Sequence, residues 1–248
     1  MRILLLNPNT TQSVTQRLAD AAAKVISPGT TLAPLTAPRG VPYIATRAEA
    51  QIGGGVALEM LAEHHRSADA AIIAAFGDPG LLGARELFDI PIVGMAEAAM
   101  LTACMLGRKF VIVTFAMALT PWYEETVALH GLRSRCAGIR MLDDSFRSIS
   151  DVQEEKEDLL VDLANRAIVE TSADVVIFGG APLAGLADKV KHRIPVPVVD
   201  QVQAAVRQAE TLAILNVNKA TVGTMRRPAA KSTIGLAAAL AARIEHKD

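Results

Sequence analysis

The sequence predicts an α/β fold made of two pseudo-symmetric halves, each built on a parallel sheet, with a binding site in the cleft between them. Short aliphatic runs alternate with longer amphipathic stretches along the chain, and several sequence blocks occur twice at a nearly constant spacing. Strands that alternate with helices are typical of a parallel sheet covered by helices on both faces.

The expected strands are almost continuous in Ile, Val, Leu and Ala, as strands buried on both faces require. They are Ile3–Leu6, Ala70–Ala75, Ile90–Val93, Phe110–Thr114, Val175–Phe178 and Val196–Val199, and a further strand is expected to begin near Cys136. The expected helices are Thr11–Val25, Ala57–His65, Leu81–Leu87, Ala96–Leu106, Glu124–His130, Asp151–Glu170 and Gln201–Leu215.

An internal repeat indicates that the two halves are copies of one unit. Ser67-Ala-Asp-Ala-Ala-Ile-Ile-Ala-Ala matches Ser172-Ala-Asp-Val-Val-Ile-Phe-Gly-Gly, and Ile90-Pro-Ile-Val matches Val196-Pro-Val-Val one residue out of register. We therefore expect residues 1–107 and a C-terminal helix over 230–245 to form the first half, and residues 108–215 the second. Residues 216–229 are then a connecting tail.

The repeat also locates the binding site, because ligands of open parallel sheets bind beyond the carboxyl ends of the strands. The sequence reads Asn7-Pro-Asn-Thr and Phe76-Gly-Asp-Pro-Gly at two of these ends, and Gly179-Gly-Ala-Pro at the equivalent end in the second half. The expected substrate-binding residues are Asn7, Asn9, Thr10, Phe76, Gly77, Asp78, Thr114, Gly180, Ala181 and Pro182.

Structural roles compete with binding at several of these positions. Asn9 or Thr10 at a helix start suits an N-cap, and Asp78 suits a cap on the helix that follows it. Gly179 and Gly180 are expected to leave main-chain N–H groups open to a ligand oxygen.

These motifs, together with Gly94-Met-Ala-Glu-Ala-Ala and Ala181-Pro-Leu-Ala-Gly-Leu, resemble the Asp/Glu/hydantoin racemase superfamily, and most of all its hydantoin and allantoin racemase branch. The resemblance runs from residue 2 to about residue 240. It implies two Rossmann-like (flavodoxin-like) halves, no cofactor, and a small carboxylate or cyclic ureide bound between them.

The same resemblance implies catalysis by two cysteines, one at the matching strand end of each half, which exchange protons with opposite faces of the substrate. The family motif and the internal repeat select the same two positions, and here these are Ala75 and Gly180. Cys104 is expected inside a helix as a small apolar residue and Cys136 at a strand start, so neither replaces the missing pair. The residues that carry the chemistry are therefore unknown at this stage.

Four further side chains are candidates for a lid or a clamp over the cleft. Tyr43 and Arg47 follow the first half's second strand, and Arg47 suits a carboxylate clamp or, alternatively, an exposed helix start. Trp122 and Tyr123 fall in the equivalent loop of the second half, where a core or interface role is the alternative.

Composition excludes several classes of protein. With 51% hydrophobic residues and a net charge of −1, the chain is neither disordered nor basic enough for a nucleic-acid protein. It lacks a membrane-spanning run, a signal peptide and a metal-spaced cluster. We expect a cytoplasmic homo-oligomer that binds a small molecule and needs neither cofactor nor metal.

Three functions remain open. The first is a racemase or related isomerase acting on an amino-acid derivative or cyclic ureide through groups other than thiols. The second is a cofactor-independent lyase, decarboxylase or hydrolase on a small carboxylate, and the third is a binding protein without turnover.

Overall fold

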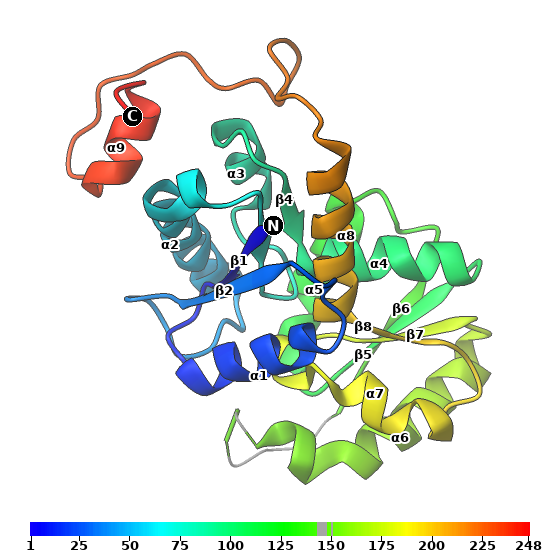
Figure 1. Ribbon diagram of the computed structural model, residues 1–248. Helices are drawn as coiled ribbons and strands as arrows, with labels where there is room; N and C mark the ends of the chain where they lie inside the picture. The colour runs from blue at the N-terminus through cyan, green and yellow to red at the C-terminus, as the bar shows by residue number, and fades with distance from the viewer. Residues whose placement is uncertain (143–147, 150) are drawn as a thin grey trace.

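The computed structural model describes residues 1–142, 148–149 and 151–248, and it contains two four-stranded parallel sheets flanked by helices (Figure 1). The first sheet comprises β1 (Arg2–Asn7), β2 (Thr31–Thr36), β3 (Ala70–Ile73) and β4 (Ile92–Gly94). The second comprises β5 (Phe110–Thr114), β6 (Cys136–Met141), β7 (Val175–Phe178) and β8 (Val198–Asp200).

The α-helices divide between the halves in chain order. They are α1 (Gln12–Ala23), α2 (Arg47–His64), α3 (Leu81–Leu87), α4 (Met95–Leu106), α5 (Thr120–Leu129), α6 (Val152–Thr171), α7 (Leu186–Val190), α8 (Gln201–Leu215) and α9 (Ala238–Ile244). A short 3₁₀ helix, η3 (Ala181–Leu183), follows β7.

The two sheets have the same topology. Their strand orders are β2-β1-β3-β4 and β6-β5-β7-β8, so β1 and β5 occupy equivalent positions, as do β3 and β7. The predicted pseudo-symmetric α/β fold is confirmed. In each sheet the order reverses between the first and third strands, which is where doubly wound sheets bind ligands.

Alternation along β1 builds two apolar layers. Ile3 and Leu5 face the core that includes α1, α8 and the whole second half, whereas Leu4 and Leu6 face a smaller core with α2 and α3. Successive side chains of a strand point to opposite faces, so one four-residue aliphatic run serves both layers.

Two helices cross between the halves. Helix α4 follows β4 but packs against β5, β7 and β8 of the second sheet. Helix α8 follows β8 but packs against β1, β3 and β4 of the first sheet, and the two helices also pack on each other. Packing thus does not follow the sequence boundary near residue 107, and the large core contains residues of both halves.

β2 is absent from the expected strands, whereas β6 begins at Cys136 as expected. β2 and β6 are edge strands and contain Pro34 and Gly138, so they lack the continuous apolar run of the central strands. Helix α2 begins ten residues before the expected start, at Arg47, because Thr46 and Glu49 form a reciprocal capping box there. Trp122 and Tyr123, expected in a loop, lie in the first turn of α5.

The C-terminal helix is shorter than expected, since residues 230–237 lie outside it and α9 spans only Ala238–Ile244. It returns to the first half and packs on α2, where Leu240 joins the smaller core. Arg243 is buried and donates to the Leu87 carbonyl at 2.8 Å and to Asp89 at 2.6 Å. None of the helices in the described part of the chain is both long and apolar enough to cross a membrane.

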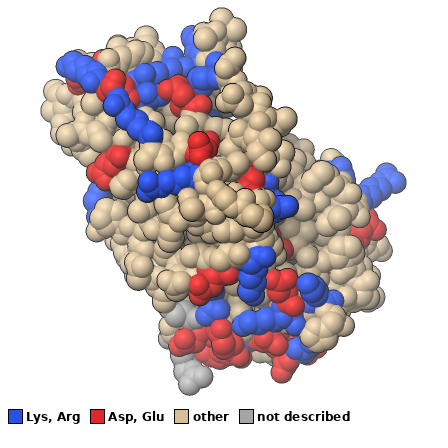
Figure 2. All heavy atoms as spheres, in the orientation of Figure 1, with Lys and Arg blue, Asp and Glu red and all other residues tan. Residues whose placement is uncertain are grey.

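Charged groups of both signs are interspersed on the face shown in Figure 2. Several form exposed ion pairs, among them Arg39 with Glu59 at 2.7 Å and Arg193 with Asp158 at 2.7 Å. Exposed pairs of this kind contribute little to stability, about 0–1 kcal/mol each.

Two glycines allow α2 to approach the loop before α3. A Cβ on Gly54 would lie 2.9 Å from the Gly80 nitrogen, whereas a Cβ on the adjacent Gly55 would meet nothing within 4 Å. The Gly-rich segment inside α2 is therefore a close-packing point at Gly54 rather than a hinge.

We expect Gly54→Ala to lower the free energy of unfolding by about 1–3 kcal/mol, because the added methyl group forces the backbones apart. The matched control Gly55→Ala should raise it by about 0.5–1 kcal/mol through helix propensity. Urea unfolding followed by circular dichroism measures both. Equal effects of the two substitutions would show that the close approach is unimportant.

Candidate functional site

The carboxyl ends of β3 and β7 face each other and enclose a small cavity. Its lining comes from both halves and consists of Asn9, Tyr43, Ile44, Ala75, Phe76, Trp122, Tyr123, Gly180, Ala181 and Pro182. The two positions that the repeat pairs, Ala75 and Gly180, thus lie on the same cavity. Its volume is about 20 Å³, enough for one water molecule but far below the roughly 300 Å³ of ordinary ligand pockets.

Aromatic side chains fill the rest of the cleft. The rings of Phe76 and Tyr123 meet edge to face with centroids 4.8 Å apart, and Trp122 lies 5.7 Å from Tyr123. Tyr43 lies 5.9 Å from Phe115. Five of the nine aromatic residues of this aromatic-poor chain therefore gather where the halves meet.

The backbone at Gly180 takes a conformation that favours glycine. Its φ is +120°, and a Cβ there would lie 2.8 Å from the Phe115 ring and 3.5 Å from the Tyr123 hydroxyl oxygen. The Gln201 side chain holds this residue on both sides: its Oε1 accepts from the Gly180 N–H at 3.0 Å, and its Nε2 donates to the Gly180 carbonyl.

Gly179 and Gly180 therefore do not leave their N–H groups open, contrary to expectation. The Gly179 N–H donates to the Val113 carbonyl at 2.9 Å, as the sheet continues one residue past β7, and the Gly180 N–H is taken by Gln201. The sequence does not predict these two hydrogen bonds, because Gln201 begins a helix 21 residues further on.

Asn7 organises the loop after β1. Its Nδ2 donates to Asn9 Oδ1 at 3.0 Å and to Thr15 Oγ1 at 2.9 Å, while its Oδ1 accepts from the Asn9 N–H at 3.2 Å. Thr10 donates its N–H to the Val41 carbonyl at 3.0 Å. Of the Asn7-Pro-Asn-Thr segment, only Asn9 lines the cavity. Contact of Asn7 or Thr10 with a substrate stays a prediction.

Two phenols in the cleft stay neutral at physiological pH. Burial raises the pKa of both Tyr43 and Tyr123 well above the ordinary value. The Thr114 hydroxyl, fully buried at the end of β5, interacts with the Tyr123 phenol and opposes part of this rise. The Tyr43 hydroxyl is buried without a hydrogen-bond partner among the described residues. Both phenols are therefore proton donors rather than bases.

Asp78 caps a different helix from the one expected. Helix α3 is capped by Gly80 without a side-chain bond, whereas the Asp78 carboxylate accepts from the Ala96 and Glu97 N–H groups of α4, both at 2.8 Å. Asp78 takes a positive φ of 49° to reach them. The sequence does not reveal this, because residues 78 and 96 come together only when β3 and β4 pair in the sheet.

His130, at the end of α5, completes a buried charge network with Asp78. Its Nε2 lies 3.2 Å from Asp78 Oδ2 and its Nδ1 lies 3.4 Å from Glu97 Oε1, and Arg85 pairs with Glu97 through both terminal nitrogens. The sequence placed His130 at a helix end and Glu97 in a first turn, but not in contact with each other.

The ionisation of this network follows from its contacts. Burial opposes a charged imidazole, but the hydrogen bonds to Asp78 and Glu97 outweigh it and raise the pKa of His130 to about 9. Burial likewise opposes a charged Glu97, and the contacts with His130 and Arg85 outweigh it and lower its pKa to about 2. At Asp78 burial dominates and raises the pKa.

Trp122 separates the cavity from a larger hollow of about 320 Å³ that opens to solvent. Arg47, Gln51, Gly77, Asp78 and Glu125 are among the residues that line it. Arg47 is exposed, and its guanidinium pairs with Glu125 at 2.6 Å across the two halves. Arg47 thus lies at this entrance and not in the cavity.

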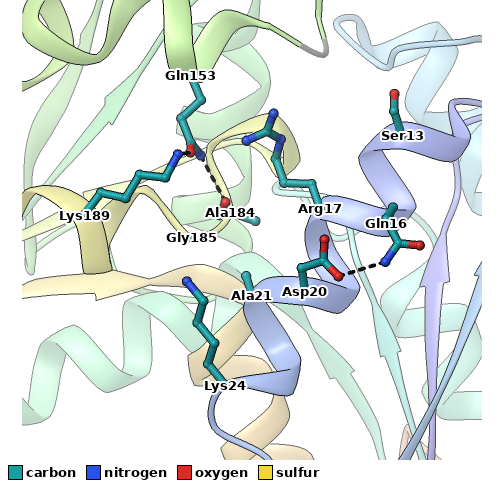
Figure 3. A pocket seen from close by; sticks show the side chains of 10 residues that line it. All are labelled: Ser13, Gln16, Arg17, Asp20, Ala21, Lys24, Gln153, Ala184, Gly185 and Lys189. Atoms are coloured by element: carbon teal, nitrogen blue, oxygen red, sulfur yellow. Dashed lines mark hydrogen bonds between the residues drawn. The ribbon is translucent and has the colours of Figure 1, made fainter.

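A third hollow, of about 440 Å³, lies behind the site between α1 and α7 (Figure 3). The basic side chains around it have acidic or amide partners: Arg17 pairs with Glu154 at 2.9 Å, and Lys189 donates to Gln153 Oε1 at 2.5 Å. Gln153 in turn donates to the Ala184 carbonyl at 3.0 Å, and this hydrogen bond holds the loop that starts at Gly180.

The two cysteines lie away from the cleft. Cys104 is half-buried inside α4, and Cys136 begins β6, where burial raises the pKa of its thiol. The described residues contain no group of three or more His, Cys, Asp or Glu side chains arranged to hold a metal ion.

The fold and the site define a class of protein: a pseudo-symmetric pair of α/β halves with a cavity between the carboxyl ends of its sheets. A family model described as Asp/Glu/hydantoin racemase matches residues 3–209. The chain belongs to this family.

Similar proteins span almost the whole chain. A hydantoin racemase from Paenarthrobacter aurescens is 31% identical over 93% of this chain and 99% of its own length. The structure of an allantoin racemase from Pseudomonas fluorescens is 34% identical with a TM-score of 0.89, covering 95% of this chain and 100% of its own. That of an allantoin racemase from Klebsiella pneumoniae is 31% identical with the same TM-score, covering 95% and 96%.

We expect Gly180→Ala to lower the free energy of unfolding by about 1–3 kcal/mol, because it combines a positive φ with a contact against Phe115. Gly185→Ala is the matched control, since its φ is also positive (+85°) but its Cβ would meet only Ala21, at 3.5 Å. Urea unfolding should therefore show a smaller loss for Gly185→Ala. A larger loss at position 185 would contradict the packing constraint at position 180.

Proposed function

We propose that this chain is an isomerase acting on a small cyclic ureide or amino-acid derivative, of the hydantoin or allantoin kind, in the cleft between its halves. Full-length similarity to hydantoin and allantoin racemases supports the substrate class. The observation that carries the proposal is the place of Tyr123: its hydroxyl lies 3.5 Å from where a side chain at position 180 would begin.

In this proposal a phenol stands where the family resemblance implies a thiol. The C–H bond next to the carbonyl breaks, its proton passes to water, and the electron pair moves onto the carbonyl oxygen. Asn9 and the unpartnered Tyr43 hydroxyl donate hydrogen bonds to that oxygen. The neutral Tyr123 then protonates the carbon from the side of the second half and recovers its proton from water.

The first half contributes no acid or base at the matching position, since Ala75 carries no titratable group. Proton removal therefore depends on solvent and on stabilisation of the enolate. We expect slower turnover than with two positioned acid–base groups, each of which contributes about 10²–10⁴-fold.

We expect the protein to catalyse exchange of deuterium from D₂O into the acidic carbon of hydantoins or allantoin, followed by nuclear magnetic resonance. Tyr123→Phe should reduce the exchange rate by at least about tenfold, because the ring contacts remain and only the proton donor is lost. Tyr43→Phe is the comparison, and it should also lower kcat, because it removes a hydrogen-bond donor to the enolate oxygen. Failure of the wild-type protein to exchange any of these substrates would rule the proposal out.

Decarboxylation of a small carboxylate is a second candidate, and a specific observation favours it. The residues that line the described cavity offer neutral donors and no ionised base. Loss of CO₂ needs no base, because the breaking C–C bond supplies the electron pair, and the same donors stabilise the resulting enolate.

The two functions differ in the mass of the product. If the isomerase proposal holds, incubation with a panel of hydantoins, allantoin and α-substituted malonates, read by mass spectrometry in H₂O, should show no mass change. Loss of CO₂ from a malonate that Tyr123→Phe abolishes would establish the decarboxylase instead. Saturable binding measured by calorimetry, with neither exchange nor mass change, would identify a binding protein.

A further inference from the structure

Helix α5 carries the aromatic side chains that close the cleft at one end and His130 at the other. Trp122 and Tyr123 lie in its first turn and are 8% and 2% exposed. His130 is its C-terminal cap, and the His130 side chain is 6% exposed. Trp122 and Tyr123 line the 20 Å³ cavity, so displacement of the first turn of this helix would open the cavity to a substrate.

Two consecutive residues of the first half hold the two ends of α5. Gly77 lies directly under the Trp122 indole, since a Cβ at position 77 would be 2.3 Å from the ring. Asp78 binds His130 with its carboxylate at 3.2 Å. Helix α5 therefore packs against the turn after β3. We call α5 seated when both of these contacts are made.

The surroundings of His130 favour the charged imidazolium when α5 is seated. Both ring nitrogens face carboxylate oxygens, those of Asp78 and Glu97. A neutral imidazole has one N–H and can donate to only one of them, whereas the imidazolium donates to both. Arg85 holds Glu97 from the other side, and the Ala96 and Glu97 N–H groups hold Asp78, so both acceptors are fixed in place.

A second link between α5 and the first half is weak. Arg47 and Glu125 pair at 2.6 Å, but their side chains are 60% and 55% exposed. Exposed pairs contribute about 0–1 kcal/mol, whereas a buried carboxylate left without its partner is costly. The buried bridge is thus the stronger of these two charged contacts.

We infer that His130 is a positioning residue: by bridging Asp78 and Glu97 it seats α5 so that Trp122 and Tyr123 close the cleft, and substrate enters when the bridge opens. The charged groups that face it are Asp78 and Glu97, with Arg85 behind them, and Tyr123 of its own helix interacts with Asp78. The inference rests on the proposed function only in treating the cleft as the substrate site.

Loss of the His130 proton should therefore unseat the helix. The raised pKa of His130 means that the folded protein keeps this proton up to about pH 9, whereas the unfolded chain loses it near pH 6.5. The stabilisation is complete below pH 6.5, declines between these two values and is absent above pH 9. The fraction of molecules with α5 seated should likewise fall as the pH rises through about 9.

Trp122 is the only tryptophan and reports directly on this movement. We expect its emission to shift to longer wavelength, and its quenching by acrylamide to increase several-fold, in a transition near pH 9. The raised pKa of both tyrosines keeps tyrosinate quenching out of this range. His130→Gln should show the unseated emission already at pH 7 and lose the transition, while His130→Lys, which keeps a cation, should restore much of the seated emission.

Controls separate positioning from general destabilisation. Glu125→Gln removes the exposed link and should leave the transition near pH 9. Far-ultraviolet circular dichroism should stay constant across it, because only α5 moves. If His130→Gln does not fold, Glu97→Gln serves instead and should move the wild-type transition to lower pH, since one carboxylate is lost.

A fluorescence signal that stays flat through pH 9 in the wild-type protein, or a transition retained in His130→Gln, would overturn the inference. An activity readout distinguishes it from the proposed function. If the cleft is the substrate site, His130→Gln should lower kcat at pH 7, because Tyr123 moves with α5, and His130→Lys should restore much of it. A Trp122 transition without any catalytic activity would leave the positioning role standing and remove the proposed reaction.

Discussion

Buried carboxylates cap the two helices that cross between the halves. Asp78 accepts from the Ala96 and Glu97 amides of α4, and Asp200 accepts from the Val202 and Gln203 amides of α8. The first N–H groups of a helix have no partner within it, and its N-terminus carries partial positive charge, so a buried carboxylate is stabilised there. Helix α4 packs on the second sheet and α8 on the first. The Asp78 cap therefore connects the end of β3 to the second half, and the Asp200 cap connects the end of β8 to the first half.

The two halves cap their crossing helices in different ways. In the second half Asp200 is itself the helix cap and also accepts from the Gly185 N–H, which joins the loop to the helix. In the first half the carboxylate comes from the loop, at Asp78, and Gly94 is the cap residue. Because it belongs to the loop, Asp78 is also able to accept from His130 of the other half. The departure from symmetry thus creates the contact that seats α5 beside the cleft.

The structure around position 180, where the family resemblance implies a thiol, suits a glycine. Gly180 lies in a backbone conformation that favours glycine, against Phe115 and within reach of the Tyr123 hydroxyl, and Gln201 fixes both of its main-chain polar groups. A cysteine at position 180 would require this arrangement to change. The first half differs, since Ala75 has no side chain beyond Cβ and contributes only a methyl group to the cavity.

Local pattern determined the fold and the place of the cleft. The aliphatic runs at β1, β3, β5 and β7 are buried on both faces, so their sequences are nearly continuous in apolar residues, and the repeat fixed their pairing into two equivalent sheets. The sequence repeat alone pairs Ala75 with Gly180, because equivalent positions of repeated units occupy equivalent places in the fold.

Tertiary structure alone decided which polar groups meet. Asp78 caps α4 instead of α3, His130 reaches Asp78 and Glu97, and Gln201 occupies the amide of Gly180. These partners are 18 to 52 residues apart in the chain. Hydrogen bonds and ion pairs depend on ångström-scale approach, which follows from how helices cross between sheets and leaves no periodic trace in the sequence. The sequence by itself therefore determined the family and the location of the site, while the groups that hold it closed became visible only in the packed molecule.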